Sequence, residues 1–504
     1  MSNAVEPTST LPVEIERQLS ACGLDVKAVL HHRENVKLHL SAKSPRFFPI
    51  EDTCRRENGG ILALPTKSVV PNERKSIVAF VPAAGASSRY LQPLLPLIEA
   101  LKSRNASSCQ QELALLRGDG FLDCPLPASI KELISYLDSA PASIPSALAD
   151  RVISELDAPK ALYPAVIDGL TFLKIKHFEH EAIGRISGEV YISPPQYSEK
   201  FLSQLANEKS ALTTRVYEQD ARLATTRFDA HGDVAVDQLG QVSTVPSGHG
   251  ALLQLIPRVA EDFKEARGIF IRNIDNIGGN SASAIEASQL FLDAFSWTVG
   301  QMDELRLCIT ANTRQRGTMI SNRILDFWGI PPKNPDDALI TLFSDLFHAT
   351  PDAIQNDLLA LVMRPLVLMG QVPNTARDIG GTCVFTSVAG VPQKLCLEVP
   401  HASPSCRANF LENPAKATHF NPVFVASEIF SNDSLRAWND HAFWLIAKKS
   451  WRGKDVYYQE SILYEMLGSS QYANVIFVEM PRLVFNPHKT LKDTHRVARS
   501  RWSI

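Results

Sequence analysis

Small residues follow a short apolar run within Ser76–Arg89, and together they form a pattern suited to binding phosphate. The run Ile77–Val81 is apolar throughout, as a strand buried on both faces must be. Backbone N–H groups can close around a phosphate chain where the side chains are small, as they are at Ala83, Ala84, Gly85, Ala86, Ser87 and Ser88. Gly85 can take the positive φ of such a turn, and Arg89 adds a forked, charged donor. The pattern predicts a strand, a phosphate-binding turn and a helix, or else a tight turn used only for packing.

A carboxylate follows a second apolar segment, G-I-F-I-R-N-I-D-N at Gly268–Asn276. The segment predicts a strand that brings Asp275 to its carboxyl end, where α/β folds bind their ligands. A carboxylate at that place suits Mg²⁺, a hard cation that takes oxygen ligands from the protein and from phosphates. Mn²⁺ accepts the same ligands. The other interpretation of Asp275 is a turn or helix-capping residue.

Two glycines flank a histidine in V-P-S-G-H-G-A-L-L at Val245–Leu253. Gly248 and Gly250 lack side chains, so the backbone beside His249 can approach a planar ligand closely. A helix is predicted directly behind them. The segment is therefore a candidate for binding a base, and the alternative is a histidine with a structural role.

These segments need a scaffold of alternating strands and helices, which places the chain in the α/β class. The patterns predict a strand at Glu189–Ser193, a helix at Ser198–Leu205, mostly helices over 281–365, and strands and turns from Arg364 onward. We expect four regions. They are an N-terminal helical cap and linker at 1–72, a nucleotide-binding core at 73–300 with a helical insertion at 102–157, a second helical insertion at 301–365, and an acceptor-side sheet with the C-terminal region at 366–504.

The composition is that of an ordinary globular enzyme. The chain has 504 residues, a hydrophobic content of 45% and a net charge of -3, which argues against nucleic-acid binding through a basic surface. Eight scattered Cys without C-x-x-C spacing indicate reduced thiols. The first residues do not resemble a secretory signal, and no apolar run reaches the length of about 18 residues that spans a bilayer. We therefore expect a cytoplasmic protein that binds neither nucleic acid nor membrane.

The order of the motifs resembles that of nucleotidyltransferases that act as sugar-phosphate pyrophosphorylases. D-A-P-K-A-L-Y-P at Asp157–Pro164 is similar to their Pro-Lys-x-Leu-x-Pro motif, whose Lys contacts phosphate groups, and this implies that role for Lys160. The G-H-G and N-I-D-N segments look like those that hold the base and the metal in UDP-sugar pyrophosphorylases. Gln219 falls where these enzymes carry a glutamine near the nucleotide. An exposed lysine and a surface amide are the alternatives for Lys160 and Gln219.

Six residues are candidates for binding the second substrate: Gly380, Gly381, Glu398, Asn421, Lys448 and Lys449. The segment G-V-P-Q-K-L-C-L-E resembles the pyrophosphorylase hairpin whose Glu meets the sugar, which is Glu398 here. The two glycines indicate a loop that faces the same cleft, and T-H-F-N-P-V presents the asparagine. The two lysines precede a turn and either neutralise phosphate or are simply solvated.

Four segments, P-A-A-G-A-S-S-R, P-S-G-H-G-A-L, I-R-N-I-D-N and T-H-F-N-P-V, resemble in order the bacterial family named domain of unknown function 4301. The resemblance covers about residues 13–495 and implies a nucleotidyltransferase-like fold of the GT-A or Rossmann-like kind. Such a fold has a mixed sheet flanked by helices, helical insertions and a C-terminal α+β region. One departure stands out. Sugar nucleotidyltransferases typically carry Gly-x-Gly-Thr-Arg, whereas Ser87 replaces the second Gly here and leaves less room for phosphate.

These observations predict an Mg²⁺-dependent nucleotidyltransferase, in which a phosphorylated acceptor attacks the α-phosphorus of a nucleoside triphosphate and releases pyrophosphate. Such chemistry needs positioning and charge neutralisation, here by Arg89, Lys160 and Asp275. The resemblance favours UTP with a sugar 1-phosphate, and CTP with a phosphonate or another small phosphorylated metabolite is the alternative. The rival hypothesis is a non-catalytic protein that binds a nucleotide or nucleotide-sugar as a sensor or scaffold. The sequence leaves the oligomeric state open.

Overall fold

The computed structural model describes residues 10–41, 48–66, 76–85, 88–165, 169–206, 210–219, 223–277, 281–332, 334–375, 381–388, 391–430, 444–451 and 453–498. The chain divides into two units, each assembled from segments that are distant in sequence. Unit 1 comprises Met1–Lys75, Gln219–Ile269 and Asp293–Met480, and unit 2 comprises Ser76–Glu218, Phe270–Leu292 and Pro481–Ile504.

Unit 2 is built on parallel strands. β3 (Ser76–Pro82) pairs in parallel with β4 (Gly188–Ser193), which pairs in parallel with β5 (Thr213–Glu218). All residues of β4, and all of β3 after Ser76, are buried, because parallel strands are covered on both faces. The helices α8 (Phe172–Ile183), α9 (Ser198–Leu205) and α19 (Leu491–Ala498) belong to the same unit.

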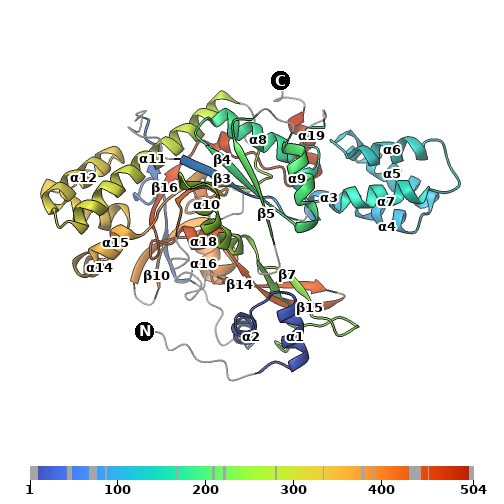
Figure 1. The fold of residues 1–504 in the computed structure, drawn as a ribbon, viewed down its shortest axis with the longest axis horizontal. Coiled ribbons are helices and arrows are strands. Elements are labelled where there is room, and N and C mark those ends of the chain that lie inside the picture. The colour runs from blue at the N-terminus through green and yellow to red at the C-terminus, as the bar shows by residue number, and fades with distance from the viewer. Residues whose placement is uncertain are drawn as a thin grey trace. The chain divides into compact units, whose positions relative to one another are not determined.

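A group of helices follows β3 in the chain, as Figure 1 shows. They are α3 (Ser88–Leu91), α4 (Leu95–Lys102), α5 (Ala106–Gly118), α6 (Ala128–Leu137) and α7 (Ser146–Leu156). α5, α6 and α7 lie within 102–157, the range expected to be helical. Their buried leucines, including Leu113, Leu133 and Leu148, join one apolar cluster with Phe172 of α8.

Unit 1 contains strands of both directions. β16 (Asn474–Glu479) pairs in parallel with β2 (Leu62–Ala63) and with β9 (Leu366–Pro373). β12 (His419–Phe420) and β13 (Phe424–Glu428) pair with β9 in the antiparallel direction. β8 (Ala266–Arg272) begins in unit 1 and ends in unit 2.

The strands form a nine-stranded mixed sheet in the order β2-β16-β9-β13-β8-β3-β4-β5, with β12 attached to β9. The expectation of a mixed α/β fold flanked by helices is therefore confirmed. No helix among the residues described has the length and apolar character needed to cross a membrane.

Three smaller antiparallel arrangements complete the strands of unit 1. β1 (Ile50–Thr53), β10 (Thr382–Val388) and β11 (Val391–Leu397) form one sheet. β14 (Trp444–Trp451) pairs with β15 (Lys454–Ser461), and β6 (Ala224–Thr226) pairs with β7 (Thr244–Pro246). α1 (Val13–Ala21) and α2 (Val26–Leu40) contribute to an apolar cluster with Phe228 and Ile446.

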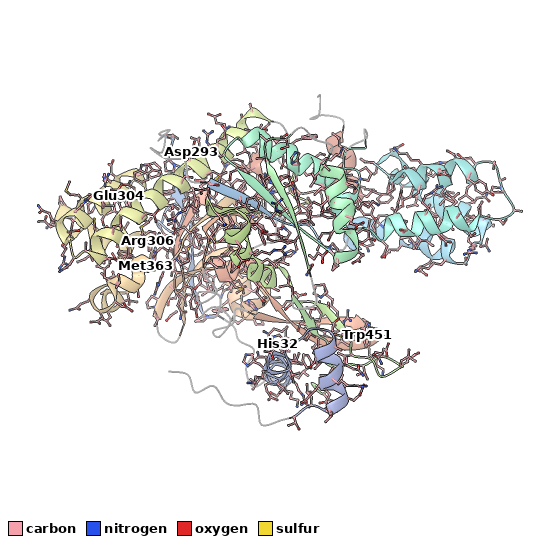
Figure 2. The ribbon with its side chains drawn as sticks, in the orientation of Figure 1. His32, Asp293, Glu304, Arg306, Met363 and Trp451 are labelled. Carbon is pink, nitrogen blue, oxygen red and sulfur yellow. The ribbon has the colours of Figure 1, made fainter. Side chains whose placement is uncertain are left out.

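The other helices of unit 1 follow β7 and β8 and lie partly within 301–365. They are α10 (Ile256–Asp262), α11 (Ala282–Thr310, which begins in unit 2), α12 (Arg314–Phe327), α13 (Ala338–Thr341), α14 (Pro351–Asn356), α15 (Leu358–Met363), α16 (Pro404–Cys406) and α18 (Leu463–Leu467). Arg306 of α11 donates to the backbone oxygens of Val362 and Arg364 and to both carboxylate oxygens of Glu428. Figure 2 labels Arg306 and Met363 where α11 meets α15. This arginine therefore holds α15 to the sheet.

Candidate functional site

Lys160 lies in the interior of unit 2, with 7% of its surface exposed. It begins a 3₁₀ turn, Lys160–Leu162, directly after Pro159. Its Nζ atom lies 3.6 Å from Oδ2 of Asp275 and donates to the backbone oxygen of His488. The same atom lies over two aromatic rings, 4.9 Å from the centre of Tyr90 and 5.2 Å from that of Phe172. The structure therefore brings together two of the predicted catalytic residues and excludes the interpretation of an exposed lysine.

The two charged side chains of this pair differ in how much of each is exposed to solvent. The side chain of Lys160 is 9% exposed and that of Asp275 is 26% exposed. Burial lowers the pKa of Lys160, and the charge of Asp275 opposes this shift. The two ring faces stabilise the ammonium further. The pair thus consists of a buried cation, Lys160, and a carboxylate that solvent can reach, Asp275.

The C-terminal segment of unit 2 holds the loop that carries Asp275. β8 ends at Arg272, and the N–H of His488 donates to the backbone oxygen of Asp275 at 2.9 Å. The N–H of Asn486 donates to Oδ1 of Asn276 at 2.8 Å, and the N–H of Ile277 donates to the oxygen of Asn486 at 3.2 Å. Sequence reasoning missed this role of N-P-H. Nothing local to the tripeptide indicates its partner.

A second group of buried charges supports the same loop from within. Lys176 donates to Oε2 of Glu179 at 2.9 Å and to the backbone oxygen of Asn276. Arg272 donates to the same two acceptors, at 3.2 Å each. Burial and the charge of Arg272 lower the pKa of Lys176 to about 8. These residues are not among the sequence-predicted sites, although the Lys176–Glu179 spacing of one helical turn and an arginine ending a buried strand are detectable signals.

The predicted phosphate-binding turn follows β3 in the same unit. Gly85 does not adopt the positive φ expected of it, and a Cβ there would meet no atom of the other residues that the structure describes within 4 Å, its chain neighbours apart. Ala83 is buried, Ala84 is half-buried, and Ala86 and Ser87 lie outside the described residues. Ser88 and Arg89 begin α3, whose next residue, Tyr90, contacts Lys160. Within unit 2, the helix after the turn, α3, therefore contacts Lys160 through Tyr90.

The G-H-G segment belongs to unit 1, at the start of the 3₁₀ helix η6 (His249–Leu255). A Cβ at Gly250 would lie 2.6 Å from the carbonyl carbon of Ser461, and one at Gly248 would lie 2.9 Å from its oxygen. Gly248 also has a φ of +84°. The fold itself therefore requires both glycines, because the end of β15 packs against them. His249 is exposed between them, and its predicted contact with a base stays a prediction.

Two candidates for the acceptor site meet in unit 1, where the N–H of Asn421 donates to the oxygen of Gly381 at 2.8 Å. The side chain of Asn421 is buried, donates to the oxygen of Gly370 at 2.9 Å and accepts from the N–H of Val423 at 2.8 Å. Val423 has a φ of 57°, so the asparagine supports a strained turn. Gly380 lies outside the described residues.

Glu398 is half-buried and follows β11 directly. Its N–H donates to Oε1 of Glu465 at 2.8 Å, and Nδ1 of His401 lies 2.6 Å from both carboxylate oxygens of that residue. Glu465 is fully buried in α18. This buried carboxylate fixes the backbone at Glu398, and sequence reasoning did not identify it.

The two lysines proposed for the acceptor site lie at the surface of unit 1. Lys448 and Lys449 are on β14, where Lys448 pairs with Asp455 at 2.7 Å and Lys449 lies 4.0 Å from Glu460. Gln219 is half-buried directly after β5.

Among the described residues, no three His, Cys, Asp or Glu side chains gather to hold a metal ion. A lone carboxylate such as Asp275 still fits Mg²⁺, which usually keeps several waters and takes further oxygens from phosphates.

The fold is one that solved structures share. A variant of UDP-glucose pyrophosphorylase from Leishmania major aligns with a TM-score of 0.51 and 11% identity, over 96% of this chain and 79% of that chain. A second variant of the same enzyme, in complex with UDP-glucose, aligns with a TM-score of 0.50, again at 11% identity over 96% and 79%. At this identity the likeness shows the fold alone. The chain thus has the α/β fold of these pyrophosphorylases.

The family is shown by sequence. The model of the family described as "Domain of unknown function (DUF4301)" matches residues 195–499, and the chain belongs to that family. No curated protein matches the chain.

Proposed function

We propose that this protein is an Mg²⁺-dependent nucleotidyltransferase of the pyrophosphorylase type. The observation that carries the proposal is the pair of Lys160 and Asp275, a buried ammonium 3.6 Å from a partly exposed carboxylate in one unit. The fold supports it, since two solved structures with the same fold are UDP-glucose pyrophosphorylases and one of them holds UDP-glucose. Transfer of a nucleotidyl group needs fixed charges more than a protein nucleophile, and this pair supplies both signs.

In the proposed reaction an oxygen of the acceptor phosphate attacks the α-phosphorus of the triphosphate. The bond between that phosphorus and the bridging oxygen to the β-phosphorus breaks, and pyrophosphate leaves with the electron pair. Asp275 would hold Mg²⁺, which supplies positive charge to the phosphate oxygens. The His488 carbonyl and Asp275 hold the ammonium group of Lys160 in place. Its positive charge would therefore already be positioned for the reaction.

Other residues complete the proposal with less specific support. Backbone amides of the turn that ends at Arg89 would bind phosphate, together with the Arg89 side chain. Gln219 would lie near the nucleotide. His249 between its two glycines would contact the base, and Glu398 would face the acceptor. UTP with a sugar 1-phosphate is the preferred substrate pair, and CTP with another phosphorylated metabolite or phosphonate is the alternative.

The test is release of pyrophosphate from each of the four nucleoside triphosphates with Mg²⁺, against a panel of sugar phosphates and small phosphonates. We expect release with one pair and its loss in Lys160→Met and Asp275→Asn. Lys448→Met is the matched control, because Lys448 is an exposed lysine that pairs with Asp455. Binding of a triphosphate without turnover on the whole panel would instead support a nucleotide-binding sensor or scaffold.

A further inference from the structure

The helical part of unit 1 holds a cavity of about 610 Å³ that is open to solvent. Ten of the described residues line it: Cys308, Ile309, Asn312, Arg314, Leu339, Ile340, Pro351, Ile354, Gln355 and Leu358. They come from α11, α12, α13, α14 and α15 and from the turn between α11 and α12. Among the residues that the structure describes, none proposed above for nucleotidyl transfer lines this cavity.

The size and the walls of the cavity suit a small molecule. Binding sites for such ligands typically measure about 300–1,000 Å³ and have mostly apolar walls with few polar groups. Here Cys308 and Leu339 are buried in the wall, whereas Ile340 remains 46% exposed. A large aliphatic side chain that is left half in water at a cavity gains free energy when an apolar ligand covers it.

One charged side chain stands among the ten lining residues, that of Arg314. Arg306 of α11 pairs with Glu428 at 2.7 Å and Arg323 of α12 with Glu304 at 3.0 Å, whereas the exposed Arg316 of α12 is not among the ten lining residues. The exposed guanidinium of Arg314 has no ion pair or hydrogen bond with any residue that the structure describes. Its planar donor set matches an anionic oxygen group, and the amides of Asn312 and Gln355 lie on the same cavity.

We propose that this cavity binds a small amphipathic anion. The apolar body of the ligand lies against Ile340, Ile354 and Leu358, and its carboxylate, or another singly charged oxygen group, contacts Arg314. The assignment goes beyond nucleotidyl transfer and does not depend on it, because the two sets of residues are separate.

The experiment uses the whole chain and two kinds of probe. The first is 8-anilinonaphthalene-1-sulfonate, an aromatic sulfonate whose fluorescence rises in an apolar site. The second is octanoate, which is titrated as a competitor and compared with 1-octanol, a neutral molecule with the same tail. We expect one saturable site, displacement by octanoate, and displacement by 1-octanol that is weaker by about tenfold or more, as expected for loss of a hydrogen bond between charged groups.

Three variants locate the site. Arg314→Ala is expected to weaken binding of the sulfonate and of octanoate by about tenfold or more, for the same reason. Leu358→Trp adds bulk to the cavity wall and is expected to abolish binding of both. Arg323→Ala is the matched control on the same helix, and it should bind as the natural chain does. Urea unfolding of each variant shows that it is folded.

Several results would overturn the proposal. They are an absence of saturable binding in the natural chain, equal displacement by octanoate and 1-octanol, and unchanged affinity in Arg314→Ala or Leu358→Trp. A dimer of the natural chain that dissociates in folded Leu358→Trp would also overturn it, because a second copy would then be the occupant of this surface. Since none of these readouts measures turnover, they leave the test of nucleotidyl transfer untouched.

Discussion

The Nζ atom of Lys160 lies 3.6 Å from Oδ2 of Asp275, although the two residues come from distant segments of the chain. Lys160 follows α7, the last of the helices between β3 and α8 that precede it, and Asp275 follows β8. The C-terminal segment joins them, because His488 accepts from the lysine and donates to the backbone of the aspartate. Three segments thus converge on one pair of opposite charges.

Removing either charge of this pair should reduce turnover strongly and the free energy of unfolding only moderately. Lys160→Met keeps the alkyl packing against Tyr90 and Phe172, and Asp275→Asn keeps the shape of the side chain. For each we expect a loss in kcat of about 100-fold or more, as for other preorganised charged groups. The cost in unfolding free energy should be about 1–3 kcal/mol. Steady-state pyrophosphate release and urea unfolding check this, and kcat equal to that of Lys448→Met would contradict it.

Glu179→Gln should strongly destabilise unit 2. The change removes the carboxylate charge that Lys176 and Arg272 share in the interior and leaves two buried cations without it. Breaking a buried ion pair in this way typically costs about 3–5 kcal/mol. The control is Glu181→Gln on the same helix, whose side chain is 35% exposed and lies 3.9 Å from Nε2 of His177, and whose change should cost less, about 0–1 kcal/mol. Similar midpoints of urea unfolding for the two variants would show that the buried network contributes little.

Two glycine-to-alanine changes in unit 1 should act in opposite directions. Gly250→Ala places a methyl group 2.6 Å from the backbone of Ser461, and overpacking of this kind costs about 1–3 kcal/mol. Gly300→Ala meets nothing within 4 Å inside α11, and alanine should stabilise that helix by about 0.5–1 kcal/mol. Thermal unfolding of both variants measures the contrast. A stable Gly250→Ala would mean that the end of β15 moves aside easily.

Acid should destabilise the protein through His488. Burial, together with the charge of Lys160, lowers the pKa of His488 to about 4. The unfolded chain, with an ordinary histidine pKa of about 6.5, therefore binds more protons than the folded chain between pH 6.5 and about 4. Stability contributed by this residue is present above that window and is lost as the pH falls through it, by up to about 1.4 kcal/mol per pH unit. His488→Gln should flatten that slope in urea unfolding at several pH values, and an unchanged slope would contradict the assignment.

Glu465→Gln should impair use of the acceptor if the proposed function holds. Its Oε1 accepts from the N–H of Glu398, and both of its oxygens lie 2.6 Å from Nδ1 of His401. An amide in either orientation therefore turns its N–H₂ toward one of these two donors. We expect KM for the acceptor to rise by about tenfold, with little change in binding of the triphosphate. The control is Glu189→Gln, another buried carboxylate with histidine partners, which should cost stability without raising that KM. Faster amide hydrogen exchange at 398–401 in Glu465→Gln would show the loss of positioning even without an assay of turnover.

The sequence by itself determined the local elements and the family. The apolar run at Ile77–Val81 predicted β3, because a strand covered on both faces is apolar throughout. The expected helix Ser198–Leu205 coincides with α9. The motif order identified the family and the mixed α/β fold.

Only the tertiary structure decided which distant residues meet. It buried Lys160 beside Asp275 and joined the N-P-H and N-I-D-N segments by backbone hydrogen bonds. It directed Lys176 and Arg272 to the same backbone oxygen, that of Asn276. It also showed that Gly248 and Gly250 accommodate Ser461 and that Asn421 supports a turn. These outcomes depend on pairing between segments that are far apart in the chain, and a local pattern carries no information about the partner of a side chain or the depth at which it lies.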